Sequence, residues 1–285
     1  MAKLIDGKAV SSAVKAEVAE EVRVLQEKGI RPGLAVVLVG DDPASRIYVN
    51  NKRKACEATG IYSEEYLLPE TISQPELLDL ISRLNEKGEI HGILVQSPLP
   101  NGLNEAAVVE AISPKKDVDA FHAYNVGKLM QGRSIFQPCT PAGIIELIRS
   151  TGTEISGKHC VVIGRSDIVG KPMAMLLLQN NGTVTVCHSK TANLPEITRQ
   201  ADILVSAVGK AGFVTADMVR PGAVVLDVGM NRNSSGKLCG DVEFAEVEPT
   251  ASWITPVPGG VGPMTIAMLL RNTVTAAKLQ NGMAL

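Results

Sequence analysis

Short apolar runs that alternate with stretches of helical spacing constrain the fold of this chain more than any other feature. The runs are rich in β-branched residues and too short for a helical core, so each predicts a buried strand. They are residues 34–39, 91–96, 158–163, 183–187, 203–205 and 224–228, and residues 61–68 are a further strand-like stretch. Strands that alternate with helices require right-handed crossovers and a mostly parallel sheet, whose ligand sites lie beyond the carboxyl ends of the strands.

Apolar positions spaced by three and four residues predict the helices between these strands. The predicted helices are residues 11–28, 45–60, 77–87, 105–111, 142–149, 173–178 and 264–279. Ser73 and Glu76 predict a capping box before one of them, and Thr140 and Pro141 suit the N-cap and N1 positions of another. The expected fold class is therefore α/β.

A polar stretch near Gly132 and Pro138 divides the predicted strands into two groups. A chain of 285 residues is long enough for two domains. We place a linker region at residues 121–137, between an N-terminal α/β domain at 1–120 and a Rossmann-like, doubly wound parallel-sheet domain at 138–263. The segment 264–285 carries an apolar helix, which we expect to pack back on the first domain.

Composition and cysteine spacing exclude several classes of protein. The formal net charge of -2 and the 3% aromatic content give no basis for nucleic acid or a membrane as a partner, so we expect a small-molecule substrate. The five cysteines contain no C-x-x-C pair and the four histidines show no metal-ligand spacing, so we expect no metal site. No secretory signal or membrane-spanning run is evident, which predicts a cytoplasmic protein.

One face of the predicted helix 45–60 carries a candidate acid/base pair. Ser45, Tyr48 and Lys52 are spaced by three and four residues, which places their side chains on the same side of a helix. A phenol beside an amine can transfer protons, because burial can lower the pKa of a lysine toward the working pH. The alternative is a solvated basic face, which the neighbouring Arg53 and Lys54 favour.

A glycine turn after the strand 158–163 is a candidate phosphate site. Strand, turn and helix place a helix N-terminus beneath a phosphate, although Ser166 stands where a G-x-G-x-x-G motif has its second glycine. About 20 residues later, Ser189 and Lys190 occupy the place of the acid that holds the ribose of NAD. With Arg165 in the turn, this pattern favours NADP over NAD. A purely structural turn would use the same glycines.

Two further segments are candidate ligand contacts. Residues 255–265 are dense in proline and glycine and predict a rigid loop whose backbone amides could hold a ligand, although an interdomain elbow would look the same. Asp119 could be a helix cap or a solvated acid. Its carboxylate could also bind a pair of donors such as an amino-pyrimidinone edge.

These segments together resemble one known family across nearly the whole chain. The matching motifs are the S-x-x-Y-x-x-x-K array at Ser45, Tyr48 and Lys52, GILVQSPLP from Gly92, KDVDAF from Lys116, PCTPAG from Pro138, VVIGRSDIVGKP from Val161, CHSKT from Cys187, DVGMNR from Asp227 and TPVPGGVGPMT from Thr255. The chain thus closely resembles the bifunctional methylenetetrahydrofolate dehydrogenase/methenyltetrahydrofolate cyclohydrolase family, which acts in one-carbon folate metabolism. The resemblance implies a folate-binding catalytic domain, an NADP-binding domain and a homodimer.

The resemblance also implies roles for individual residues. Lys52 would be the central acid/base residue, Tyr48 its partner against the pterin, Gln96 a polarising contact to Lys52 and Asp119 the anchor of the pterin ring, with Ser45 at the substrate. The implied NADP contacts are Gly164, Arg165, Ser166, Ser189 and Met230, and the implied folate border is Pro258, Gly259 and Gly260. The chain departs from the family pattern at Ser97, Ala120 and Met230, where the family usually has leucine, glycine and isoleucine.

Two other functions fit part of this pattern. The Y-x-x-x-K spacing is also that of a short-chain dehydrogenase, but there the pair follows the nucleotide turn, whereas Lys52 precedes Gly164. A noncatalytic NADP-sensing or scaffold protein could keep the same fold, since fold alone does not prove activity.

Overall fold

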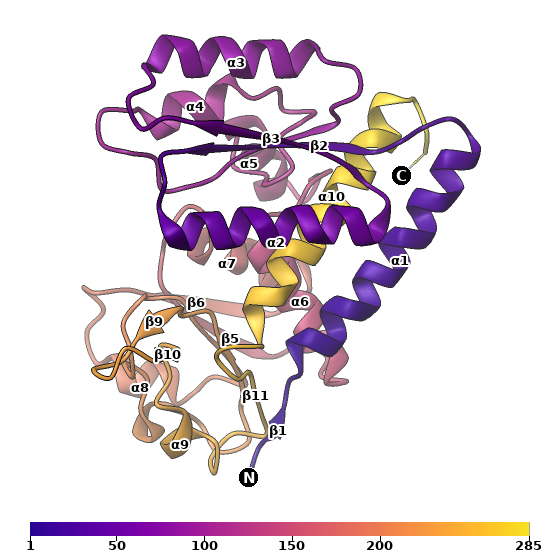
Figure 1. Ribbon diagram of the computed structural model, residues 1–285. Helices are drawn as coiled ribbons and strands as arrows, with labels where there is room; N and C mark the ends of the chain where they lie inside the picture. Colours follow the sequence, from indigo (N-terminus) through magenta and orange to yellow (C-terminus); the bar gives the residue numbers. More distant parts are fainter. Residues whose placement is uncertain (285) are drawn as a thin grey trace. The chain divides into compact units, whose positions relative to one another are not determined.

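The computed structural model describes residues 1–284, apart from the side chain of Ala44. The chain divides into two compact units, whose elements are labelled in Figure 1. Residues 1–12 and 138–265 form the first unit. Residues 13–137 and the segment from Ile266 to the end of the described chain form the second. Neither unit is therefore one continuous stretch of sequence.

Six parallel strands form the sheet of the first unit, in the order β1-β11-β8-β7-β5-β6. They are β1 (Lys3–Leu4), β5 (His159–Ile163), β6 (Thr183–Cys187), β7 (Ile203–Ser206), β8 (Val224–Asp227) and β11 (Trp253–Ile254). The central strands β7 and β8 are buried throughout, as expected of a parallel sheet with both faces covered. The α/β class and the parallel sheet predicted from sequence are confirmed.

Helices and one small hairpin complete the first unit. They are α6 (Cys139–Ser150), α7 (Gly170–Gln179), α8 (Leu194–Thr198), the 3₁₀ helix η1 (Ala216–Met218), the strands β9 (Asn231–Arg232) and β10 (Leu238–Cys239), and α9 (Phe244–Val247). The core of this unit combines side chains from alternate positions of β5, β7 and β8 with those around α8, η1 and α9.

The strand order reverses beside β5. β6 follows β5 in the chain and pairs with one side of it, and β7 pairs with the other side. Ile163, the last residue of β5, is in register with Cys187 of β6 and with Ser206 of β7. The turns that follow these three strands therefore begin at one edge of the sheet, at the kind of switch point where open α/β sheets bind ligands.

The second unit has a smaller sheet of three parallel strands in the order β3-β2-β4. Its elements are β2 (Gly33–Val39), α2 (Pro43–Thr59), β3 (Tyr62–Leu68), α3 (Gln74–Glu86), β4 (Gly92–Val95), α4 (Glu105–Ala111) and α5 (Ala123–Met130). Figure 1 shows α2 on one face of this sheet and α3 and α4 on the other. Alternate residues of β2 pack against α3 and Val108 of α4, while β2 itself is buried along its whole length.

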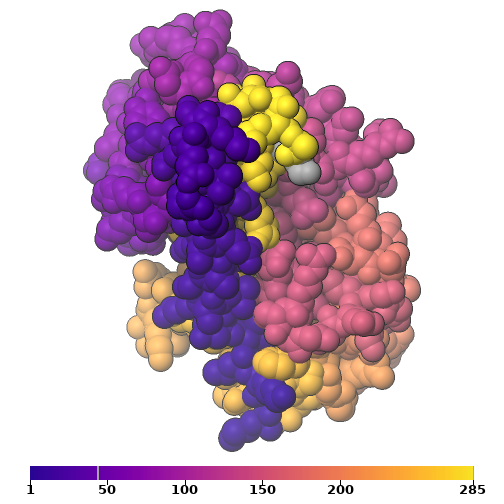
Figure 2. Space-filling view, turned by 90° about the vertical axis from the view of Figure 1, so that its right-hand side faces the viewer, coloured from indigo at the N-terminus to yellow at the C-terminus, as the bar shows by residue number. Residues whose placement is uncertain are grey.

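Two long helices belong to both units by sequence, α1 (Gly7–Glu27) and α10 (Val261–Gln280). Within the second unit, α10 is tied to its surroundings by polar contacts. Asn272 Nδ2 donates to the carbonyl oxygens of Val118 and Gln137 at 2.8 and 2.9 Å. Arg271 and Lys278 pair with Glu17 and Glu21 of α1 at 2.8 and 2.5 Å. Figure 2 shows the C-terminal segment, in yellow, beside α1, in indigo.

The structure differs from the sequence-based expectations at two helices. α6 begins at Cys139 with Pro138 as N-cap, so Thr140 and Pro141 lie inside its first turn and the predicted cap is wrong. The helix starts early because Ala142 N already donates to Pro138 O at 2.9 Å. Residues 121–137, expected to be a linker region, contain α5, whose N-cap is a histidine rather than a serine or aspartate. The predicted capping box at Ser73 and Glu76 is confirmed.

Within residues 1–284, every helix is too short or too polar to cross a bilayer.

Candidate active site

Helix α2 presents Lys52 in a buried position. The helix begins where the Asp42 side chain accepts a hydrogen bond from Ser45 N at 2.7 Å, and it ends at Gly60, whose φ of 79° lies in the left-handed region. Lys52 is only 8% exposed, whereas Tyr48, one turn earlier, is 39% exposed. The basic run at 52–54 is therefore not a uniformly solvated face, because the first of its three cations is buried.

Gln96, at the end of β4, accepts a hydrogen bond from Lys52. Gln96 follows β4, and its backbone N donates to Val37 O at 2.8 Å. Its side-chain Nε2 donates to Ser97 O at 2.7 Å, which turns Oε1 toward Lys52 Nζ at 2.9 Å. Because a carbonyl oxygen only accepts, this contact holds both the ammonium and the neutral amine of Lys52 in the same place.

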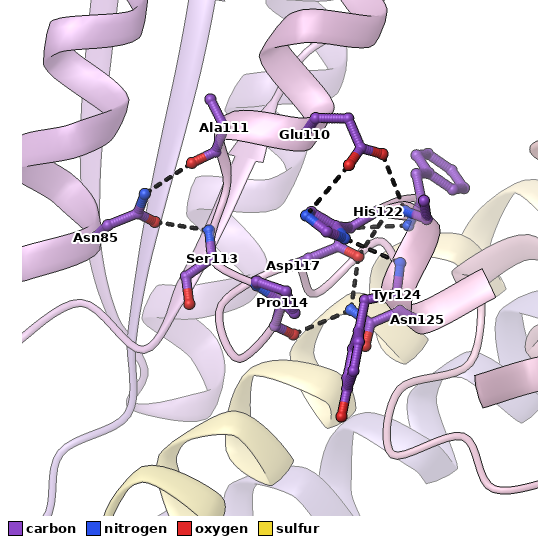
Figure 3. Close-up of polar contacts among 11 residues, drawn as sticks. Asn85, Glu110, Ala111, Ser113, Pro114, Asp117, His122, Tyr124 and Asn125 are labelled. Atoms are coloured by element: carbon purple, nitrogen blue, oxygen red, sulfur yellow. Dashed lines mark hydrogen bonds and ion pairs between the residues drawn. The ribbon is translucent and has the colours of Figure 1, made fainter. Parts of the chain in front are cut away.

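The turn that carries Asp119 is built around a different carboxylate, Asp117, as Figure 3 shows. Asp117 is 2% exposed and accepts hydrogen bonds from Phe121 N at 3.2 Å, His122 N at 2.9 Å and Asn125 Nδ2 at 2.7 Å. Burial raises the pKa of Asp117, against the effect of these donors. The Asp117 carboxylate thus fixes the backbone that follows the half-buried Asp119.

The same turn lies next to β4. Ile93 and Asp117 form a parallel bridge, and Ile93 N donates to Lys116 O at 2.8 Å. Asp119 follows this bridge by two residues, inside the turn that Ala120 N closes on Asp117 O at 3.1 Å. Ala120 completes the turn with a φ of 61°, which is the left-handed region that a glycine adopts without strain. Lys52, Gln96 and Asp119 therefore come from neighbouring segments of one unit.

The predicted cofactor residues occupy the carboxyl edge of the larger sheet, in the first unit. Gly164 follows β5, and its N donates to Cys187 O at 2.9 Å. A Cβ on Gly164 would lie 2.3 Å from Ala207 O, and one on Gly170 would lie 2.3 Å from Gly164 O. The turn is thus a bare backbone cradle that leads into the N-terminus of α7, and such a cradle fits a phosphate.

Hydroxyl and basic side chains surround this cradle. Ser166 Oγ accepts hydrogen bonds from Val169 N and Gly170 N at 3.2 and 3.3 Å, so the serine at the place of the second glycine holds the backbone at the start of α7. Arg165 and Ser189 are both exposed at this edge. No acidic residue occupies positions 188–191, after β6, where a carboxylate would repel a 2′-phosphate. The residues present therefore fit NADP.

The remaining predicted residues also lie in the first unit. Met230 follows β8 and is 48% exposed. The proline- and glycine-rich loop follows β11, where Gly259 has a φ of 107° and a Cβ on Gly260 would lie 2.6 Å from Pro256 O. The structure thus places Ser45, Tyr48, Lys52, Gln96 and Asp119 in the second unit, and Gly164, Arg165, Ser166, Ser189, Met230, Pro258, Gly259 and Gly260 in the first. Among residues 1–284, the acidic, histidine and cysteine side chains form no cluster suited to a metal ion.

Sequence reasoning missed the buried carboxylates that support both sites. These are Asp117 in the second unit, and Asp227 and Asp241 in the first. Burial raises the pKa of Asp227 to about 6, although backbone N–H groups of Asp241, Val242 and Gly229 donate to it. The only local signal in the sequence is a valine directly after the acid, in Lys-Asp-Val for Asp117 and in Gly-Asp-Val for Asp241.

Comparison with known proteins places the whole chain in one family. Residues 5–119 match the tetrahydrofolate dehydrogenase/cyclohydrolase catalytic domain, and residues 138–281 match the NAD(P)-binding domain of the same family. The bifunctional protein FolD of Acetivibrio thermocellus is 60% identical over 279 residues, which are 98% of each chain.

Solved structures agree with this assignment. The bifunctional FolD methylenetetrahydrofolate dehydrogenase/cyclohydrolase of Campylobacter jejuni has a TM-score of 0.96 and 52% identity, covering 98% of this chain and 99% of its own. The Trypanosoma brucei enzyme, solved with NADP and an inhibitor, has a TM-score of 0.93 and 42% identity, covering 98% of each chain. The chain belongs to the tetrahydrofolate dehydrogenase/cyclohydrolase family.

Proposed function

We propose that the protein oxidises 5,10-methylenetetrahydrofolate to 5,10-methenyltetrahydrofolate with NADP and then hydrolyses the product to 10-formyltetrahydrofolate. The observation that carries this proposal is the buried amine of Lys52, held by the Gln96 carboxamide at 2.9 Å. It is supported by family membership over the full length of the chain.

In the oxidation step, the protein binds and orients the folate. NADP, when bound, supplies the acceptor for the hydride that leaves the methylene carbon. The two nitrogens that flank this carbon share the resulting positive charge, so the step needs no strong base. Asp119 binds the paired donors of the pterin edge through its carboxylate, and Tyr48 packs against the ring. Ser45 lies on the same helix face.

In the hydrolysis step, Lys52 moves protons. Water loses a proton as it attacks the methenyl carbon, and a ring nitrogen gains one as the ring opens. One amine can accept the first proton and donate the second, at a typical gain of about 10²–10⁴-fold. Gln96 Oε1 keeps its hydrogen bond to Lys52 in both protonation states, so the amine stays oriented through the cycle.

The cofactor and folate contacts follow the same proposal. Gly164 and Ser166 hold the pyrophosphate of NADP at the start of α7, while Arg165 and Ser189 bind its 2′-phosphate and Met230 touches the cofactor. Pro258, Gly259 and Gly260 border the folate. We accordingly propose that residues 1–120, together with the helix in 264–285, bind folate and that residues 138–263 bind NADP.

Two absorbance assays test the function directly. One follows reduction of NADP or NAD with 5,10-methylenetetrahydrofolate, and the other follows loss of supplied 5,10-methenyltetrahydrofolate. In Lys52→Met and Lys52→Gln we expect cyclohydrolase activity to fall by at least about 10²-fold while the dissociation constant for NADP stays the same. Lys54→Met is the matched control, since Lys54 is an exposed cation two residues away. Formyl-folate production at the wild-type rate by Lys52→Met would defeat the assignment.

A noncatalytic NADP-sensing or scaffold protein is the alternative function. The buried Lys52–Gln96 pair argues against it, because binding NADP requires neither residue, and so does the close relation to proteins named as bifunctional enzymes. Such a sensor would bind NADP without turnover in either assay.

We also propose that the protein is a cytoplasmic homodimer that associates through the NADP unit, as the family resemblance implies. Support comes from β6, a terminal strand of the sheet, where Val186 is 38% exposed. Light scattering of the wild type and of Val186→Glu tests this interface, and a monomeric wild type would exclude it.

A further inference from the structure

Two carboxylates, Asp227 and Asp241, are buried at the carboxyl edge of the six-stranded sheet and take no part in the chemistry proposed above. Asp227 is the last residue of β8 and is 4% exposed, and Asp241 follows β10 and is 0% exposed. Buried acids are rare unless hydrogen bonds compensate the lost hydration. The groups that donate hydrogen bonds to these two carboxylates therefore indicate their role.

Asp241 binds the loop that follows β7. Its Oδ2 accepts hydrogen bonds from Val208 N at 2.7 Å, Gly209 N at 3.3 Å and Ser206 Oγ at 3.3 Å. Its Oδ1 accepts from Lys210 N at 2.9 Å. Three consecutive backbone amides thus point at one carboxylate, and charge-assisted bonds of this kind are stronger than neutral ones.

The same carboxylate also binds the segment that follows β8. Asn231 Nδ2 donates to Asp241 Oδ1 at 2.9 Å, and Asn231 is the residue after Met230. A Cβ on Gly229 would lie 2.3 Å from Asp241 Oδ1, so the backbone before Met230 is packed directly on this oxygen. Asp241 therefore joins the loops of two neighbouring strands.

Asp227 holds Asp241 in place. Its Oδ1 accepts from Asp241 N at 2.8 Å and its Oδ2 accepts from Val242 N at 2.9 Å. A Cβ on Gly240 would lie 1.8 Å from Asp227 Oδ2, so only a glycine fits beside this acid. The segment that carries Asp241 is thereby fixed to the end of β8.

The loop held by Asp241 lies at the switch point of the sheet. It begins at Ala207, whose N donates to Ile163 O at 2.8 Å, and Ala207 O is the atom that a Cβ on Gly164 would meet. The phosphate turn after β5 thus lies directly against the loop after β7. A dinucleotide spans such a switch point, with its adenosine ribose beside the strand that follows the phosphate turn, here β6. Its nicotinamide half then faces the loops after β7 and β8.

From this geometry, and resting on the proposed function, we propose that Asp241 is a positioning residue for the nicotinamide half of NADP. It shapes the 207–210 loop and the segment around Met230 into one surface without itself touching the cofactor. Asp227 fixes Asp241 and Asn231 is its side-chain link to the second segment.

The test uses two probes on the full-length protein, NADP and adenosine 2′,5′-bisphosphate, which lacks the nicotinamide half. Asp241→Asn places an amide NH₂ against backbone N–H donors in either orientation, because both carboxylate oxygens accept such donors. By titration calorimetry we expect NADP to bind about tenfold more weakly or worse, and the bisphosphate to bind as in the wild type. Hydrogen exchange at residues 208–210 should become faster.

Matched controls separate positioning from general support. Asp202→Asn removes a carboxylate at the opposite, amino end of β7, where it accepts from His159 N at 2.9 Å. We expect Asp202→Asn to lower the melting temperature without weakening the binding of one probe more than that of the other. Asn231→Ala breaks the link to Asp241 without altering a buried charge, and Asn233→Ala changes the same residue type two positions later in the hairpin. Asn231→Ala should weaken the binding of NADP and leave the binding of the bisphosphate unchanged. Asn233→Ala should leave the binding of both probes unchanged.

Three results are decisive. Weaker binding of NADP alone, with cyclohydrolase activity on supplied methenyltetrahydrofolate retained, supports the proposal. If the binding of both probes is weakened equally, or the binding of neither changes, the proposal is overturned. Should Asp241→Asn fail to fold, the Asn231→Ala and Asn233→Ala pair decides on the same criteria. A wild-type protein that bound neither probe would instead refute the proposed function itself.

Discussion

The two units build their sites in opposite ways. In the second unit, function is assigned to side chains that α2 and the end of β4 project, such as Lys52 and Gln96. In the first unit, the cradle at Gly164 is backbone, and buried carboxylates hold the loops around it. A side-chain site is damaged by removing atoms, whereas a backbone site is damaged by adding them.

Adding one methyl group at Gly170 should have the largest effect. Its Cβ would lie 2.3 Å from Gly164 O and 2.7 Å from Arg165 N, and because both are backbone atoms the phosphate turn must move. In Gly170→Ala we expect NADP binding to weaken by about 100-fold, or about 2.7 kcal/mol, by titration calorimetry. Cyclohydrolase activity should be unchanged. The control Gly88→Ala adds a methyl at a glycine without a left-handed φ, where no atom lies within 4 Å, and unaltered NADP binding by Gly170→Ala would contradict the cradle.

Removing the charge of Asp117 should weaken the site around Asp119 in the second unit. Asp117→Asn turns an NH₂ group toward a backbone N–H of the turn, so the Asp119 carboxylate loses its fixed position. We expect KM for the folate substrate to rise by about tenfold in both reactions, with NADP binding unchanged. Asp79→Asn on the exposed side of α3 is the control. An altered NADP dissociation constant in Asp117→Asn would contradict the assignment of folate binding and NADP binding to different units.

Glu64 offers a test of stability that leaves both sites alone. Burial opposes ionisation of Glu64, but hydrogen bonds from Lys87, Tyr62 and Tyr66 outweigh it and lower its pKa to about 2. A lowered carboxyl pKa stabilises the fold above the unfolded value near 4.5, and this contribution is lost as pH falls toward 2. Glu64→Gln should therefore reduce the free energy of unfolding by about 2 kcal/mol at pH 7.

The pH dependence distinguishes this charge effect from lost packing. In chemical denaturation, the difference between wild type and Glu64→Gln should shrink as pH falls from about 4.5 toward 2. A difference that stays constant over this range would mean that the pKa of Glu64 is not lowered. Asp227 provides the opposite case within the first unit, because its pKa is raised to about 6 and its ionisation destabilises the fold as pH rises.

Ala120→Gly should have the smallest effect. Ala120 has a φ of 61°, and relief of left-handed strain is worth about 1–2 kcal/mol. The greater freedom of glycine in the unfolded chain offsets about 0.4–1 kcal/mol of this gain. Thermal melts should show a net stabilisation of at most about 1.6 kcal/mol. Ala106→Gly, in the helical and exposed first turn of α4, should destabilise instead. A clear loss of stability in Ala120→Gly would mean that the buried methyl group packs tightly.

Sequence predicted the sheets well because apolar runs such as residues 34–39 report burial directly. It could not predict β1 and β11, since two residues carry no periodicity and their pairing joins positions 3–4 with 253–254. It missed α5 because the helix is short, contains Gly127 and is capped by His122.

The candidate site was only partly predictable for a related reason. Spacing singled out Lys52, and the family resemblance implied its contact with Gln96. The two side chains form a hydrogen bond in the structure, while their catalytic roles stay predictions. Asp117 and Asp241 look like solvated loop acids in the sequence. Whether an acid is buried depends on which donors surround it, and the donors to Asp241 lie 10 to 35 residues away in the chain.

The pairing of β1 with β11 has a consequence for biosynthesis. During translation, Lys3 and Leu4 leave the ribosome about 250 residues before Trp253 and Ile254, the strand beside which they align. The six-stranded sheet of the first unit therefore cannot be completed until about residue 254 is available. By then every strand of the second unit has left the ribosome. Splitting the gene at the boundary near residue 137 would separate β1 from its neighbour, so two polypeptides divided there would not correspond to two independently folding pieces.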